Sequence, residues 1–404
     1  MIKKNSAIVD MKALLQSFEL STMHMFLLAI LSRVLLAVLA VIIVLKDENG
    51  QEVSPLVEVN FGDYEFYKEF VLEIFSMLQA PFLFFYHGGS VGDWIAQDPT
   101  GVGGLGPYVF PGPFLPWLLN VFDYSTHSLA LASVYLIASA LLVFGWVLYY
   151  RTKKVSVWGQ LALIAFPLLL WYSLAISTEL PMSIAVFMFF FGALTIRRSP
   201  FWGFACTLSA FILMLLIRPN SLSMFPVMLL VIFLNRDLMS KWCTAAVVML
   251  TGTFFMYFVV YYAPYFFMVK ESALAISYWE LYPEQYLEGL FPNLPLFVNQ
   301  VISNCALIGS KLIYATGLRP SYSDAPALFV LLRSISGIWI LPGIFYCFYL
   351  GSWLERVLLL GFLLPLLLTV AQERYLLPIA PLLLLYGGMF WKDLYLRVRE
   401  HFYL

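Results

Sequence analysis

The chain has 404 residues, of which 62% are hydrophobic and 12% are charged. An ordinary soluble domain is about 45–50% apolar and about 25% charged. This composition therefore excludes an ordinary soluble domain. The formal net charge of −1 gives no reason to expect a nucleic-acid partner. The apolar residues gather in runs long enough to cross a bilayer as helices, which predicts a polytopic membrane protein.

We therefore predict an all-α integral membrane protein that forms one polytopic domain over residues 1–404, with about ten transmembrane helices. Three lysines precede the first apolar run and no small-residue cleavage site follows it, so we interpret this run as a retained span. The predicted spans cover residues 23–45, 128–150, 157–176, 181–196, 201–217, 221–235, 242–262, 326–350, 357–371 and 375–391.

The basic residues orient these spans, because loops on the cytoplasmic side of a membrane are enriched in lysine and arginine. With a cytoplasmic N-terminus, fourteen basic and six acidic residues fall on the cytoplasmic side, against seven basic and eighteen acidic residues outside. Arg33 and Arg333 fall inside spans. Both termini are then expected in the cytoplasm.

This orientation leaves two outer-face regions, residues 46–127 and 263–325. The first contains eleven acidic residues, two lysines and no arginine. This composition is typical of a functional surface rather than of a simple connecting loop. The apolar segments 110–122 and 296–316 lie within these regions. We place both on the outer face as interfacial or re-entrant helices, because a single extra crossing would invert the charge pattern downstream. Sequence alone leaves open whether either one spans.

Residues 60–67, Asn-Phe-Gly-Asp-Tyr-Glu-Phe-Tyr, are the segment in which we expect the chemistry. Helical spacing of the apolar residues that follow predicts an amphipathic helix on the membrane, with Asp63 near its N-terminus. A carboxylate there would take a proton from an acceptor hydroxyl as a general base, with Glu58 and Glu65 as the fallback candidates. The plain alternative is that Asp63 only caps the helix.

Aromatic residues in the same region are candidates for stacking on a sugar or an acceptor. An ordered helix is not expected before about Phe114, because the preceding loop is rich in glycine and proline. Aromatic side chains at the headgroup level of a membrane are the commoner alternative. The candidate stacking residues are Tyr64, Tyr67, Tyr108 and Trp117.

Charged residues near the membrane form the second group of candidates. Glu179 is the sole charge in a short turn between the third and fourth spans, where solvation and function explain it equally well. Arg218 and Arg374 lie at the outer ends of their spans, Arg33 lies in mid-span, and Lys311 lies in the segment 296–316. Snorkelling would explain any one of these cations. Several of them on the outer side favour a lipid-linked phosphate as their ligand.

These features together resemble the GT-C integral-membrane glycosyltransferases, which include protein O-mannosyltransferases and the bacterial aminoarabinose transferase. The similarity extends along most of the chain. It is carried by the acid after Gly62, by Tyr108–Trp117, by Glu179, by Arg218-Pro-Asn220 and by Arg374-Tyr-Leu-Leu-Pro378.

The resemblance implies a polyprenyl-phosphate-sugar donor, an outward-facing site and transfer with inversion. It implies that Asp63 is the catalytic acid of the first loop, that Glu179 is a second acidic position, and that Arg374 binds the donor phosphate. We expect the acceptor to be a glycan, lipid or protein outside a bacterial inner membrane. No cofactor is expected, and the scattered cysteines and histidines indicate no metal site.

Two other functions stay open. An O-antigen polymerase or ligase also handles polyprenyl-linked sugars, but such enzymes tend to carry their main outer loop late in the chain. A transporter or flippase would need polar residues along a path at mid-membrane, and apart from Arg33 and Arg333 the predicted spans offer few.

Overall fold

The computed structural model describes ten ranges of the chain, and the description below applies to them. These ranges are residues 21–42, 45–46, 52–53, 74–96, 112–122, 128–173, 177–269, 293–318, 327–368 and 373–403. They are helical and connected by short turns, apart from one antiparallel pair of two-residue strands that aligns Leu45 with Val53.

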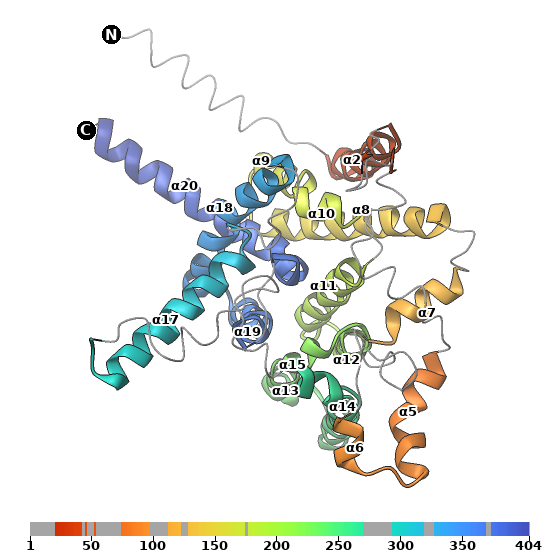
Figure 1. Cartoon of the computed structure of the whole chain (residues 1–404). Coiled ribbons are helices and arrows are strands. Elements are labelled where there is room, and N and C mark those ends of the chain that lie inside the picture. Colours follow the sequence, from red (N-terminus) through yellow and green to blue (C-terminus); the bar gives the residue numbers. More distant parts are fainter. Residues whose placement is uncertain are drawn as a thin grey trace.

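The elements of the first half are α2 (Thr22–Ile42), β1 (Leu45–Lys46), β2 (Glu52–Val53), α5 (Ile74–Tyr86), α6 (Val91–Ile95), α7 (Phe114–Val121), α8 (Ser128–Thr152), α9 (Val157–Ile164), α10 (Pro167–Trp171) and α11 (Glu179–Thr195). Those of the second half are α12 (Pro200–Ile217), the 3₁₀ turn η3 (Pro219–Met224), α13 (Phe225–Leu234), η4 (Arg236–Leu238), α14 (Lys241–Tyr261), α15 (Ala263–Val269), α17 (Leu296–Ala315), α18 (Ala327–Leu350), α19 (Trp353–Leu368), η6 (Glu373–Ile379) and α20 (Ala380–Tyr403). Figure 1 shows these helices crossing one another at varied angles, with the last turns of α20 extending away from the rest.

Six of the helical segments are long and apolar enough to cross a membrane, which agrees with the predicted helical class and suggests a membrane protein. They are Thr22–Leu39, Ala130–Thr152, Pro200–Ile217, Lys241–Tyr261, Leu296–Ala315 and Arg374–His401. Three shorter apolar helices, at 179–195, 219–234 and 334–350, accompany them. The full number of ten spans stays a prediction, and so does the interfacial placement of α17, which is itself long enough to span.

The surface of these helices is apolar where it faces outward. Met249 and Trp242 of α14 are 71% and 87% exposed, and Leu27, Leu31 and Leu35 of α2 are exposed as well. Contiguous apolar surface of this kind is unfavourable in water and suits the hydrocarbon of a bilayer.

The predicted third span, residues 157–176, is not one continuous helix. It is divided into α9 and α10, with Phe166 in an extended conformation between them. Pro167 explains the division, because proline has no N–H to donate and disfavours a helical conformation of the residue before it. Residues 174–176 lie outside the described ranges.

Helices α11 and α12 form a closely packed hairpin at the centre of the structure (Figure 1). The two helices approach through glycines: a Cβ atom added to Gly203 would lie 2.6 Å from the backbone nitrogen of Ile196, which is closer than real contacts. Small residues at a crossing allow helices in a membrane to approach in this way. The hairpin brings the first residue of α11, Glu179, to the same end as Arg218, which follows α12.

Helix α8 connects two polar clusters. The Tyr135 hydroxyl donates a hydrogen bond to the Ser177 carbonyl oxygen at 2.8 Å, beside Glu179, and the Tyr149 hydroxyl donates to Glu355 Oε1 at 2.6 Å. Positions 135 and 149 differ by 14, which is about 21 Å of helix at ~1.5 Å per residue. We call the groups at the two ends the Glu179 cluster (Glu179, Arg218 and Arg374) and the Glu355 cluster (Glu355, Tyr149 and Lys153).

Two further helices connect the same two clusters. Glu355 lies in the first turn of α19. Near the other end of this helix, Pro365 and Leu366 line the pocket beside Arg218. In the segment that contains η6 and α20, Arg374 lies next to Glu179, and Tyr386 lies next to Glu355. The two clusters therefore lie toward opposite ends of α8 and α19, and the segment formed by η6 and the first turns of α20 passes from one cluster to the other.

Candidate functional site

Glu179 is a fully buried carboxylate with two arginine partners. Its side chain is 0% exposed, Arg218 Nη2 donates a hydrogen bond to its Oε1, and Arg374 Nε lies 3.8 Å from the same oxygen. The three residues come from α11, from the residue after α12, and from η6. The carboxylate occupies the N-terminus of α11, where the helix dipole favours a negative charge.

The position of Arg218 follows from the proline after it. A residue before proline is disfavoured in the helical conformation, so α12 ends at Ile217 and Arg218 is extended, with φ −151° and ψ 141°. Its side chain then turns to α11, where Nε donates to Thr178 Oγ1 at 2.6 Å and Nη2 donates to Glu179. Two adjacent acceptors thus fix the guanidinium plane, which lysine could not do.

Arg374 reaches the cluster from a segment that contains a proline of its own. η6 includes Pro378, which cannot donate a backbone hydrogen bond, and the regular helix α20 begins only at Ala380. The Arg374 side chain is 13% exposed and lies beside Glu179, so a surface ion pair is not the arrangement observed.

Tyr375 is an aromatic neighbour of both arginines. The Cζ atoms of Arg218 and Arg374 lie 5.1 Å and 5.3 Å from the centroid of its ring. A cation within about 6 Å of a ring face is attracted by the ring quadrupole. The ring and the carboxylate together allow two like charges to lie close to each other.

The charges of the cluster do not cancel. Counting these three residues alone, two guanidiniums and one carboxylate have a formal charge of +1, and Arg374 also has a further interaction outside the three. Glu179 Oε2 and Ser177 Oγ are buried side chains that interact with each other, and neither makes a hydrogen bond of good geometry within the described ranges. The cluster can therefore attract an anion and still accept a hydrogen bond from a ligand or a water molecule.

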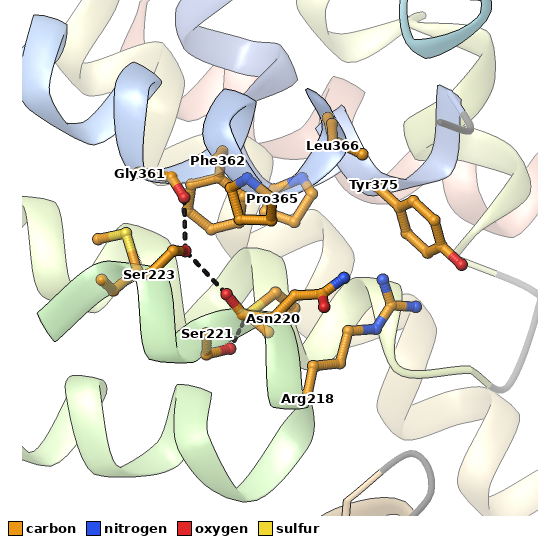
Figure 2. A pocket seen from close by; sticks show the side chains of 12 residues that line it. Arg218, Asn220, Ser221, Ser223, Gly361, Phe362, Pro365, Leu366 and Tyr375 are labelled. Carbon is orange, nitrogen blue, oxygen red and sulfur yellow. Dashed lines mark hydrogen bonds between the residues drawn. The ribbon is translucent and has the colours of Figure 1, made fainter. Parts of the chain in front are cut away.

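A pocket of about 380 Å³, counting the space that opens to the outside, lies against Arg218. One wall is polar and includes Arg218, Asn220, Ser221 and Tyr375, whereas α19 supplies an apolar wall. Figure 2 shows the Asn220 amide and the Arg218 guanidinium side by side, with Tyr375 beyond them. The lining residues of α19 are Gly361, Phe362, Pro365 and Leu366.

A proline also explains how the two walls are joined. Pro365 cannot donate to the carbonyl oxygen of Gly361, four residues before it, so that oxygen is left without its usual helical partner. The Ser223 hydroxyl lies 2.6 Å from this oxygen and 2.7 Å from the Asn220 carbonyl oxygen (Figure 2). Ser223 thereby connects η3 to the middle of α19.

The candidate residues of the first outer region lie mainly outside the described ranges. The structure describes neither the candidate acids Asp63 and Glu65 nor the aromatic residues Tyr64, Tyr67 and Tyr108, so their proposed roles stay predictions.

Trp117 is the one stacking candidate that is described. It is half-buried on α7, with its ring 5.7 Å from that of Phe114. The predicted start of helix near Phe114 is confirmed. Just before α7, Gly112 has a φ of +136° and lies so close to the Ile217 carbonyl oxygen that an added Cβ atom would be 2.6 Å away. Glycine therefore lets this loop pack directly beside Arg218, at the end of α12.

Two other predicted phosphate ligands have different surroundings. Arg33 is buried, and its described hydrogen bonds go to Ser32, Ser139 and the Ile164 carbonyl oxygen at the end of α9, so it does not join the Glu179 cluster. Lys311 is buried on α17, and α17 packs against η6, the element that contains Arg374.

Comparison with family models, with curated proteins and with solved structures found no match to this chain. Within the described ranges, no group of three or more His, Cys, Asp or Glu side chains is arranged as a metal site would be. What the site can do therefore has to be argued from its geometry and charge.

Proposed function

We propose that the protein is a membrane glycosyltransferase that uses a polyprenyl-phosphate-linked sugar as its donor. The observation that carries this proposal is the Glu179 cluster, in which two guanidiniums meet and one of them, that of Arg218, lines a pocket with one polar and one apolar wall. A lipid phosphate has the matching features, since its anionic group suits the arginines and its isoprenoid chain suits an apolar wall.

The reaction follows from this assignment. Asp63 takes the proton of an acceptor hydroxyl, whose oxygen attacks the anomeric carbon of the sugar. The bond from that carbon to the phosphate oxygen breaks, and polyprenyl phosphate leaves with the electron pair. Arg218 and Arg374 stabilise the charge that develops on the phosphate. One direct displacement inverts the anomeric centre and needs no protein nucleophile.

The geometry supports a positioning role for Glu179 rather than a role as a base. Its Oε1 is close to two guanidiniums, which stabilise the ionised carboxylate and reduce its tendency to accept a proton. By contacting both arginines, it holds them where one phosphate could touch both.

The charge bias is what supports the proposed orientation, with the Glu179 cluster outside and both termini in the cytoplasm, and the contacts bear on the number of crossings. Arg218 and Arg374 reach the same carboxylate, so an even number of crossings must separate them. Helices α13, α14, α18 and α19 would supply four. A crossing by α17 would need a further crossing to compensate, which favours the interfacial or re-entrant placement. A bacterial inner membrane is the membrane we propose.

The orientation is testable by labelling. In a variant without the native cysteines, cysteines introduced at Asn49 and Asn293 should react with a membrane-impermeant thiol reagent in intact cells. A cysteine at Thr152, which is exposed at the opposite end of α8, should react only after lysis. Labelling at 152 in intact cells together with protection at 293 would overturn the orientation and, with it, the outward-facing site.

The phosphate-binding role of the arginines is testable at Arg374. Arg374→Lys keeps the charge but loses the planar fork, so we expect weaker donor binding, by about 1.5–3 kcal/mol for one charge-assisted hydrogen bond. A titration of donor against initial rate measures it, and Arg374→Ala should be at least as impaired.

The matched control is Arg236→Lys, because Arg236 is an exposed arginine paired with Asp237 on η4. It should leave the apparent donor affinity unchanged. An unchanged donor affinity in both Arg374 variants would remove Arg374 from the site.

A further inference from the structure

One polar group in the pocket has no part in the proposed reaction. Asn220 lines the pocket between Arg218 and Ser221, and its amide makes no hydrogen bond to another residue of the described ranges. In Figure 2 the amide points into the space that the Arg218 guanidinium also faces. Asn220 is half-buried, so its amide is open to the pocket and free to donate to and accept from a ligand group there.

The backbone holds Asn220 in place. The ring of Pro219 fixes its own φ angle, directly before Asn220, and the shared hydroxyl of Ser223 connects the Asn220 carbonyl to Gly361 of α19. The amide therefore projects from a short 3₁₀ turn that is fastened at both ends. Fixed polar groups of this kind discriminate between ligands, because they do not have to be ordered on binding.

The chemistry of the amide distinguishes two ligand groups. A phosphate oxygen only accepts hydrogen bonds, and Arg218 next to Asn220 already supplies donors. A hydroxyl both donates and accepts, and a carboxamide can do both in return. Resting on the proposed function, we propose that Asn220 binds a hydroxyl of the donor sugar next to the phosphate and so determines which sugar is accepted.

Two ligands separate this role from phosphate binding. One kind of ligand is polyprenyl phosphate without a sugar. The other kind is polyprenyl phosphate linked to a hexose, tested with glucose, mannose and galactose. Asn220→Leu keeps the size of the side chain and removes the amide. It should weaken binding of the preferred sugar-linked ligand by about 2- to 10-fold, as expected for one neutral hydrogen bond, and leave binding of polyprenyl phosphate unchanged.

Asn304→Leu is the matched control, because Asn304 is an exposed asparagine of α17 outside the pocket; it should leave the affinity for both ligands unchanged. If the leucine variant does not fold, Asn220→Ala replaces it in the binding measurement, and we expect the same selective loss of affinity for the sugar-linked ligand. Equal loss of both ligands would assign Asn220 to the phosphate and overturn the inference, and so would no loss of either. If neither ligand binds the unaltered protein, the proposed function fails as well.

Discussion

Replacing Glu179 by glutamine should destabilise the folded protein by about 3–5 kcal/mol, the usual cost of removing one partner from a buried ion pair. The substitution preserves the size of the side chain, so it creates no cavity. It removes the carboxylate charge that the guanidiniums of Arg218 and Arg374 share. Equilibrium unfolding of the purified protein in one detergent measures the effect.

Two further variants make this result specific. Asp237→Asn removes an exposed acid whose ion pair with Arg236 is 3.9 Å long, and it should have little measurable effect. The double variant Glu179→Gln/Arg218→Gln should be less destabilised than the sum of its single variants, because each removes the partner of the other. An effect of Glu179→Gln as small as that of Asp237→Asn would contradict the buried cluster.

Replacing Asp63 by asparagine should reduce sugar transfer by about 10²–10⁴-fold, the usual contribution of general acid–base catalysis. Asparagine retains the ability to cap a helix, so expression and the free energy of unfolding should not change. The initial rate of transfer at saturating donor and acceptor concentrations measures the loss of the base.

Glu58→Gln and Glu65→Gln are the matched variants in the same loop. They should retain transfer within a few-fold of the unaltered protein if Asp63 is the base. Activity within a few-fold in Asp63→Asn would instead identify Asp63 as a cap, and the loss would then be sought at Glu58 or Glu65.

Most helices could be predicted from the sequence, because apolar runs and prolines determine helix positions and ends through local effects. The expected spans 128–150 and 201–217 correspond closely to α8 and α12, and the latter ends where Pro219 requires it. The break between α9 and α10 was missed, although Pro167 marks it. The two-residue strand pair was missed as well, because strands this short have no detectable periodicity.

The members of the site were recognisable one by one, but their arrangement was not. Glu179, Arg218 and Arg374 each stood out as charges near the membrane, yet their contact depends on packing between distant segments. Arg33 is also a charge in a predicted span, but its guanidinium donates a hydrogen bond to the Ile164 carbonyl oxygen at the end of α9. Tyr375 and Asn220 stand in the motifs that follow these arginines, but nothing in the sequence indicates that they line one pocket.

The most direct test of the central claim is whether the purified protein releases polyprenyl phosphate from a polyprenyl-phosphate-sugar pool when envelope acceptors are present. Mass spectrometry of the lipid fraction should show polyprenyl phosphate accumulating with time, together with an acceptor that has gained one sugar of inverted anomeric configuration. Asp63→Asn and Arg374→Ala should both abolish or strongly slow this release. If the donor pool stays intact across the sugars tested, with the folded protein and acceptor present, the protein is not the glycosyltransferase proposed.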